Sequence, residues 1–333
     1  MLTQRIAMIL VLLTSWSPGM LRAQRQPLSV EPLRSIQHEA TKTRLRIDPV
    51  RRTYTEYAVD GRIEFQPESG NFVLSWQGYD GTRQRLTWEP PSKLSAIVEA
   101  TVSFDEVSGL YTYSYSVQNL ATSVQRLKGI YVEAAGIERA SAPPGGEWYS
   151  TEMTPLVVSQ LGIPGWAWIQ FGGTRGILPG QRARGFQIVS RRPPAVVKVF
   201  VEGRRPTLRT SEDLPEELHA AIDAAYFRLP AGTTIGPAVH ELRDDIESDM
   251  RELLAMFDDS RRVGWFGSHT SADPLRGLVM DVGAAIADGD TGRAERQVSN
   301  ALRLLDTMDY NFVLSEAKAL LHHRLRLIRD KLR

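Results

Sequence analysis

Two tryptophans separated by one residue, Trp166 and Trp168, are the side chains in this sequence best suited to bind a ligand. Side chains at positions i and i+2 of a β-strand point to the same face, so a strand here would place both indoles together. A flat aromatic surface of this kind stacks on sugar rings. Trp148 and Tyr149 could extend it. We take these four residues as the candidate ligand-binding site, although a tryptophan pair at this spacing more often belongs to a hydrophobic core.

Metal sites are the second kind of chemistry considered. Asp288 and Asp290 alternate as in a calcium loop, but Arg293 stands where such a loop needs its tight-turn glycine. We therefore interpret this turn as the end of one helix and the cap of the next. His322 and His323 are adjacent, so on a helix they point about 100° apart and do not share one ligand sphere by themselves. The sequence predicts no metal site and no cofactor.

Catalytic residues are not indicated either. A glycosidase needs two carboxylates across a cleft, and the spacing of the acids in the strand region selects no pair. The sequence contains no Gly-x-Ser-x-Gly elbow and no Gly-rich phosphate loop. It contains no cysteine, which excludes a thiol nucleophile. We expect a protein that binds rather than one that catalyses. The ionisable side chains are expected to cover surfaces and cap turns instead of converging in a cleft.

The first twenty-three residues have the pattern of a signal peptide. Arg5 precedes an apolar run over residues 6–13, and Ala23 offers a small residue for cleavage. The run is much shorter than the roughly 20 residues of a membrane-spanning helix, and no later segment approaches that length. The sequence thus predicts a secreted or periplasmic chain whose mature part has no transmembrane segment.

Charge is unevenly distributed along a chain whose formal net charge is +1. Acidic residues dominate residues 211–260, and five of the last ten residues are basic. We interpret both as solvated helix faces, with an acidic docking helix as the alternative. The arginine pairs at 191–192 and 204–205 lack interleaved aromatic residues, so nucleic acid is not expected as a partner.

The elements that must position these residues change type near Gly203. Before it, alternating or β-branched runs separated by turn residues predict antiparallel strands with no helices between them, which favours a two-sheet sandwich. The expected strands are 62–66, 72–77, 85–88, 95–104, 110–119, 125–133, 167–171, 185–190 and 196–202. In the run 111–117, Tyr111, Tyr113, Tyr115 and Val117 should share the buried face.

After Gly203 the apolar period becomes helical. A short helix is expected over 214–227, followed by a Gly- and Pro-bearing connector and a helix over 240–258. Asp273 is expected to cap the next helix, with Pro274 at its first position. The predicted organisation is a signal peptide (1–23), an immunoglobulin-like antiparallel β-sandwich (24–205), a linker with a short helix (206–238) and a small α-helical bundle (239–333).

Two stretches resemble segments of known families. The first comprises 111–120, 125–132, 177–180, 185–186, Pro194 and 201–203, and it resembles a β-sandwich of uncharacterised secreted bacterial proteins. The second comprises 275–278, 284–287, 289–290, Ala294, 302–305 and 316–321, and it resembles the FIMAH-type helical domain. The second resemblance implies an accessory module at the C-terminal end of a secreted protein. The shared positions are mostly apolar or turn residues, so they indicate a fold and no activity.

These observations predict an exported, non-catalytic protein that acts in binding, adhesion or assembly at the cell envelope or outside the cell. Its partner would be a polysaccharide or an envelope protein. The alternative is a carbohydrate-binding or carbohydrate-active protein that uses the aromatic surface at Trp166 and Trp168.

Overall fold

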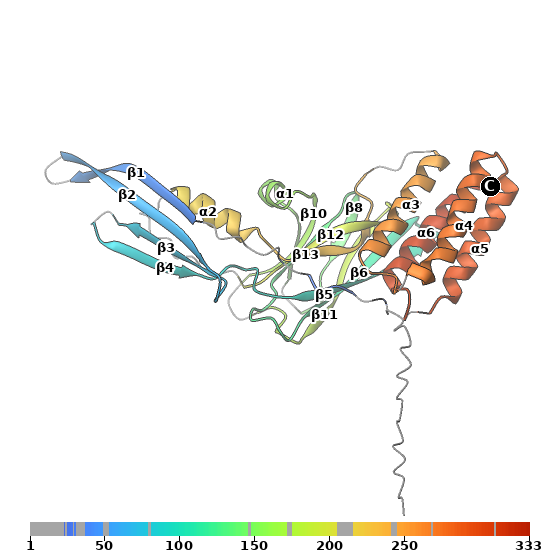
Figure 1. The fold of residues 1–333 in the computed structure, drawn as a ribbon, viewed down its shortest axis with the longest axis horizontal. Helices are drawn as coiled ribbons and strands as arrows, with labels where there is room; N and C mark the ends of the chain where they lie inside the picture. Colours follow the sequence, from blue (N-terminus) through green and yellow to red (C-terminus); the bar gives the residue numbers. More distant parts are fainter. Residues whose placement is uncertain are drawn as a thin grey trace, which may run out of the picture.

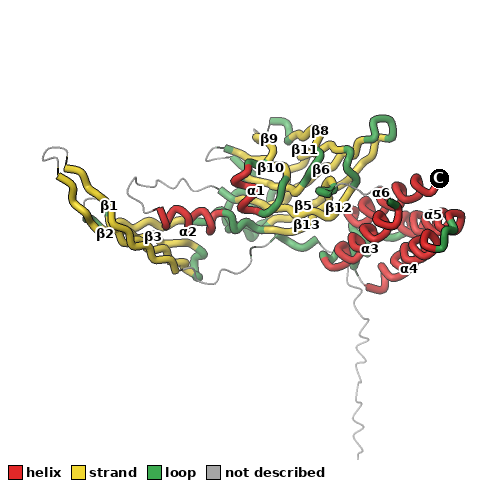
Figure 2. The backbone as a smooth tube through the Cα atoms, turned by 90° about the horizontal axis from the view of Figure 1, so that it is seen from above, coloured by secondary structure: helices red, strands yellow, loops and turns green. Residues whose placement is uncertain are grey.

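A computed structural model describes residues 23, 25–28, 30, 37–48, 53–78, 81–145, 148–171, 175–204, 216–240, 245–267, 269–309 and 311–333. Strands dominate the N-terminal part and helices the C-terminal part, as the sequence predicts. Figures 1 and 2 show three parts in a row, which we call the arm, the body and the bundle. The predicted signal peptide lies outside the described residues, except for Ala23.

The arm is a four-stranded antiparallel sheet in sequence order, covered by one helix. It comprises β1 (Gln37–Asp48), β2 (Thr53–Gln66), β3 (Asn71–Gln77), β4 (Arg83–Trp88) and the helix α2 (Glu216–Tyr226). Phe72, Leu74 and Trp88 pack with Leu218 and Ile222 of α2 in a core separate from that of the body. We expected these strands within a sandwich over residues 24–205. Alternation shows that a strand has a buried face, but it does not show which element covers that face.

The body consists of two antiparallel sheets, with strand orders β13-β12-β7-β10-β9 and β5-β6-β11-β8. Its elements are β5 (Ala96–Asp105), β6 (Leu110–Asn119), β7 (Gly129–Glu133), β8 (Ile137–Ser141), β9 (Trp148–Glu152), α1 (Pro155–Leu161), β10 (Gly165–Gln170), β11 (Arg182–Ser190), β12 (Pro194–Glu202) and β13 (Ala231–Pro237). The alternation in β6 is confirmed, because its four predicted residues are buried in turn: Tyr111, Tyr113, Tyr115 and Val117.

β13 corrects one expectation, because it lies in the segment interpreted as a linker. It pairs antiparallel with β12, from Phe200 opposite Ala231 to Pro194 opposite Pro237. Its glycines and proline are tolerated because β13 lies at the edge of its sheet. The segment after the arm helix therefore returns to the body and completes its five-stranded sheet.

The bundle contains α3 (Ile246–Arg262), α4 (His269–Ala287), α5 (Thr291–Thr307) and α6 (Ser315–Leu332). The predicted cap at the turn before α5 is confirmed, because the Asp290 side chain accepts a hydrogen bond from the Arg293 amide. The predicted start at Asp273 is wrong, since α4 begins at His269 and Pro274 lies inside it. Ala272 is fully buried, and this packing stabilises the additional turn.

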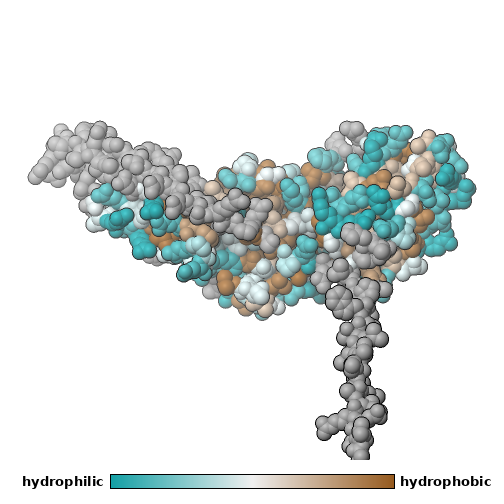
Figure 3. Space-filling view, viewed as in Figure 1, coloured by the Kyte–Doolittle hydropathy of each residue, from teal (hydrophilic) through white to brown (hydrophobic). Residues whose placement is uncertain are grey.

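The body and the bundle share one continuous hydrophobic core, to which β5, β12, α3 and α6 all contribute. On the face shown in Figure 3 the bundle is largely hydrophilic, whereas the body shows apolar residues among polar ones. Among the described residues, none of the helices combines the length and the hydrophobicity of a membrane-spanning segment.

Candidate functional site

The tryptophan pair lies mainly in the body's core. Trp168 is fully buried, and its ring centroid lies 5.8 Å from that of Tyr115 and 5.5 Å from that of Phe186, both on the opposite sheet. Its indole N–H donates to the carbonyl of Ser141 at 2.9 Å. Because no face of this ring reaches solvent, Trp168 has no surface on which a sugar could stack. Trp166 is partly buried and packs against the same core.

The two earlier aromatic residues lie on opposite faces of β9, as neighbours on a strand must. Trp148 meets the edge of Phe186 at 4.9 Å between ring centroids and belongs to the core boundary. Tyr149 is 54% exposed and lies 5.8 Å from Phe171, which is 60% exposed. The four predicted residues therefore do not form one surface. Tyr149 is exposed, and its aromatic neighbour is Phe171, which was not among the four candidate residues.

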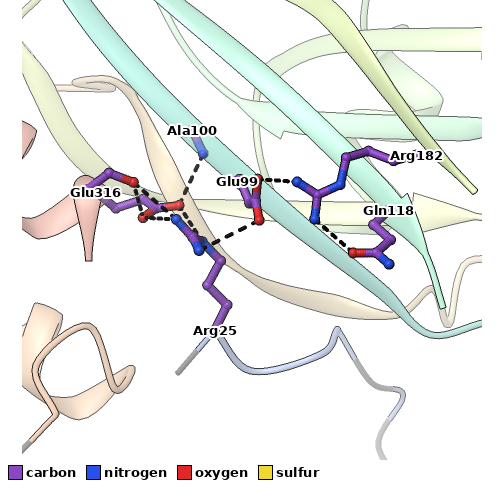
Figure 4. Close-up of polar contacts among 7 residues, drawn as sticks. Arg25, Glu99, Ala100, Gln118, Arg182 and Glu316 are labelled. Atoms are coloured by element: carbon purple, nitrogen blue, oxygen red, sulfur yellow. Dashed lines mark hydrogen bonds and ion pairs between the residues drawn. The ribbon is translucent and has the colours of Figure 1, made fainter. Parts of the chain in front are cut away.

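Ionisable side chains converge where the N-terminal segment (residues 25–28), the body and the bundle meet (Figure 4). Arg25 binds the carboxylate of Glu316 with two hydrogen bonds, Nε to Oε1 at 2.9 Å and Nη2 to Oε2 at 3.0 Å. The Glu316 side chain is only 2% exposed. It also accepts the backbone N–H of Ala100 on β5 at 3.1 Å. This carboxylate thus joins three segments that are distant in the sequence.

A second carboxylate, Glu99, extends this network along β5. It lies 3.6 Å from Nη1 of Arg25 and 2.6 Å from Nη1 of Arg182 on β11. Nη2 of Arg182 donates to Gln118 at 2.8 Å. Glu99 therefore lies between two guanidinium groups. Two acidic side chains, Glu99 and Glu316, face Arg25 from the body and the bundle.

The local structure explains why Glu316 can be buried there. It is the second residue of α6, where the positive end of the helix dipole favours a carboxylate. The hydroxyl of the neighbouring Ser315 donates to it at 3.1 Å and accepts from Arg25 at 3.0 Å. The Arg25 guanidinium, the Ser315 hydroxyl and the Ala100 amide together satisfy the hydrogen-bonding needs of this buried carboxylate. This arrangement binds and orients a guanidinium group.

Leu28 is a second anchor of the same segment. Its amide donates to the carbonyl of Ala96 at 2.8 Å, and the two residues form an antiparallel bridge. Its buried side chain lies against Gly232 of β13, where an added Cβ would come within 2.1 Å of Leu28 Cδ2. A cavity of about 210 Å³ remains beside the segment, and Val98, Thr233, Val263 and Trp265 contribute to its walls.

Other buried charges lie at contacts between parts. Arg324 of α6 is buried and donates to the carbonyl of Pro194 on β12 at 2.8 Å. Burial lowers the pKa of Arg324, and the nearby Glu252 carboxylate opposes this shift. The buried carboxylate of Glu202 on β12 accepts hydrogen bonds from the hydroxyls of Tyr131 and of Tyr226 on α2. The expectation that ionisable groups cover surfaces and cap turns is therefore wrong for Glu316, Arg324 and Glu202, because long-range packing buries them at contacts between parts.

The two adjacent histidines of α6 line a pocket of about 320 Å³ beside β5, together with Asp306 and Lys318. Their rings are perpendicular, with centroids 5.7 Å apart. Burial, followed by the neighbouring His322, lowers the pKa of His323 to about 4. The ring of Tyr111 meets His323 edge-on at 5.5 Å. His323 therefore packs as a neutral aromatic ring against the body.

Sequence reasoning missed Arg25 and Glu316, whose positions differ by 291 residues. The one local signal was the single acidic residue in the first turn of α6. No family model matches this chain, and no curated protein matches it.

Proposed function

We propose that this chain is an exported, non-catalytic protein that acts in binding, adhesion or assembly at the cell envelope or outside the cell. One observation carries the proposal: the buried charged groups at Glu316, Arg324 and Glu202 are engaged in contacts that hold parts of the molecule together. Such contacts fix the relative positions of the parts, and therefore of the surfaces that the parts carry. The signal-peptide pattern of residues 1–23 supports export to the periplasm or beyond.

The finer fold assignments belong to the same proposal. We infer an immunoglobulin-like sandwich for the body, because aromatic side chains of its two antiparallel sheets meet in one core. The resemblance of the helical tail to the FIMAH-type domain supports an accessory role for the bundle. Both inferences fit a protein that carries binding surfaces on a rigid frame.

Export is tested by the N-terminus of the purified mature chain. We expect cleavage after Ala23, which leaves Gln24 first and Arg25 second. Leu10→Arg with Leu12→Arg, which interrupts the apolar run, should leave the chain uncleaved inside the cell. An intact N-terminus on wild-type protein recovered from the extracytoplasmic fraction would contradict the proposed processing.

Binding is tested at the exposed aromatic pair. A photo-crosslinking amino acid at Phe171 should give one discrete adduct in cells, whereas the same group at Val107, which is 97% exposed on a turn, should give none. Equal labelling from both positions, or none from Phe171, would refute a binding surface at this pair.

Carbohydrate binding is the second candidate, and the exposed Tyr149–Phe171 pair is the observation that favours it. Polysaccharide would then be the partner in place of an envelope protein. A glycan array compares the wild type with Tyr149→Ala/Phe171→Ala, using Val107→Ala as the matched control. Binding that disappears only in the aromatic variant supports carbohydrate recognition, and no glycan bound by the wild type removes it.

A further inference from the structure

The groove that holds the N-terminal segment has features of a peptide-binding site. We call it the segment groove. Its walls come from β5 and β13 of the body and from the bundle. The segment is therefore held by parts of the chain that are distant from it in sequence.

The first feature is charge complementarity. Glu316 and Glu99 both face the position that Arg25 occupies, at 2.9 Å and 3.6 Å from its nitrogens. Without a cation there, the buried Glu316 carboxylate would lose its main counter-charge. The groove therefore selects an arginine, whose planar fork binds a carboxylate through two parallel hydrogen bonds.

The second feature is a shaped apolar position three residues further on. Gly232 leaves the space that Leu28 fills, and the Leu28 amide pairs with the backbone of β5. β5 is the edge strand of its sheet, so its backbone groups can receive an extended peptide. Backbone pairing at this edge supplies affinity, and the two side-chain positions supply sequence specificity.

The third feature is unused space. The cavity of about 210 Å³ beside Gln26 and Pro27 shows that the chain's own segment does not fill the groove. A well-packed internal contact leaves few voids larger than a water molecule. The groove thus has room for larger side chains between the arginine and the leucine than this chain supplies.

We propose that the segment groove is a binding site for an extended peptide of a partner protein that carries an arginine and a leucine three residues apart. The chain's own N-terminal segment occupies it in cis and must be displaced. This proposal deepens the assembly function and rests on it, because it names the chemistry of the partner. Peptide binding is measured on purified protein, whereas export and surface crosslinking are measured in cells. Failure of peptide binding alone would therefore reject this proposal and leave the proposed function standing, and failure of export or crosslinking alone would do the opposite.

The test uses a fluorescent peptide with the sequence of residues 24–30 and the purified full-length mature chain. The Arg25→Ala/Leu28→Ala variant, whose own segment is detached, should bind the peptide at least about tenfold more tightly than the wild type, since the intramolecular segment competes at millimolar effective concentration. Adding Glu316→Gln should remove most of this gain. Anisotropy titrations measure all three affinities, and circular dichroism verifies folding.

Two controls keep the test decisive. A peptide of the same composition with its arginine and leucine exchanged should bind at least about tenfold more weakly. The single variant Arg25→Gln, which keeps Leu28 in place, replaces the double variant if that variant does not fold. Its affinity for the peptide should still exceed that of the wild type, by a smaller factor. Equal binding of both peptides, or no gain in either variant, would overturn the proposal. If the wild type forms a dimer in which the segment of each copy occupies the groove of the other, the groove binds a second copy of this chain instead of a partner protein.

Discussion

The contact between Arg25 and Glu316 makes the sharpest energetic prediction. Arg25→Ala removes a two-point hydrogen-bonded cation from a carboxylate that is 2% exposed. Breaking a fully buried pair costs about 3–5 kcal/mol, because the remaining charge is left unpaired. Arg25 itself is 26% exposed, and the Ala100 amide still serves Glu316. We therefore expect the free energy of unfolding to fall by about 2–3 kcal/mol.

A double-mutant cycle isolates the pair from other effects of each substitution. Glu316→Gln removes the charge but keeps an oxygen that can accept from Ala100. In this background Arg25→Ala should cost about 1 kcal/mol or less, which gives a coupling energy of at least about 1 kcal/mol. Urea denaturation followed by tryptophan fluorescence measures each corner, and an unchanged m-value indicates that the same unfolding transition is compared.

Arg182→Ala is the matched control, because Arg182 binds the same network through the more exposed Glu99. It should cost less than about 1 kcal/mol, as surface ion pairs do. A coupling energy near zero between Arg25 and Glu316, or equal costs for the two arginine variants, would refute the assignment of a structural charge pair at the segment groove.

Three other comparisons follow. Trp168→Ala should lower the free energy of unfolding by about 3–5 kcal/mol and Tyr149→Ala by less than about 0.5 kcal/mol. Equal losses of the two variants in urea denaturation would contradict a buried Trp168 and an exposed Tyr149. Gly232→Ala should lower the free energy of unfolding by about 1–2 kcal/mol, because the added Cβ meets Leu28. Gly277→Ala should raise it by about 0.5–1 kcal/mol in the same assay, because its Cβ meets no atom and alanine favours the helix. The folded-state pKa of His323 is about 4 and its usual value is 6.5, so stability should fall as the pH drops through this range, where the unfolded state binds more protons. His323→Gln should flatten that dependence in unfolding measured across pH, and an unaltered slope would reject the assignment.

The sequence predicted what local patterns determine. The alternation from Tyr111 to Val117 identifies β6 and its buried face, because the period of a strand is a property of consecutive residues. Asp290 identifies a helix start for the same reason, since its side chain binds an amide three residues later. The change from strands to helices follows from such patterns taken together.

These local patterns do not determine which distant segments come into contact. Phe72 and Leu74 have the alternation of any half-buried strand, and nothing in it indicates that α2 covers them. Trp148 and Tyr149 were both expected to extend the aromatic surface of Trp166 and Trp168, although neighbouring residues on a strand point to opposite faces. Arg25 and Glu316 have ordinary neighbours in the sequence, and their pairing depends on how the body and the bundle dock.

The placement of buried charges suggests how the parts find one arrangement. An ion pair at a contact adds little stability over a well-packed apolar pair, but a misplaced contact leaves each charge buried and unpaired. Arg324 at the carbonyl of Pro194 and Glu316 at the amide of Ala100 both impose this penalty on a displaced bundle. The shared apolar core tolerates small shifts more readily, because the hydrophobic effect has no direction. The charges therefore fix the position of the bundle on the body, and through it the shape of the segment groove.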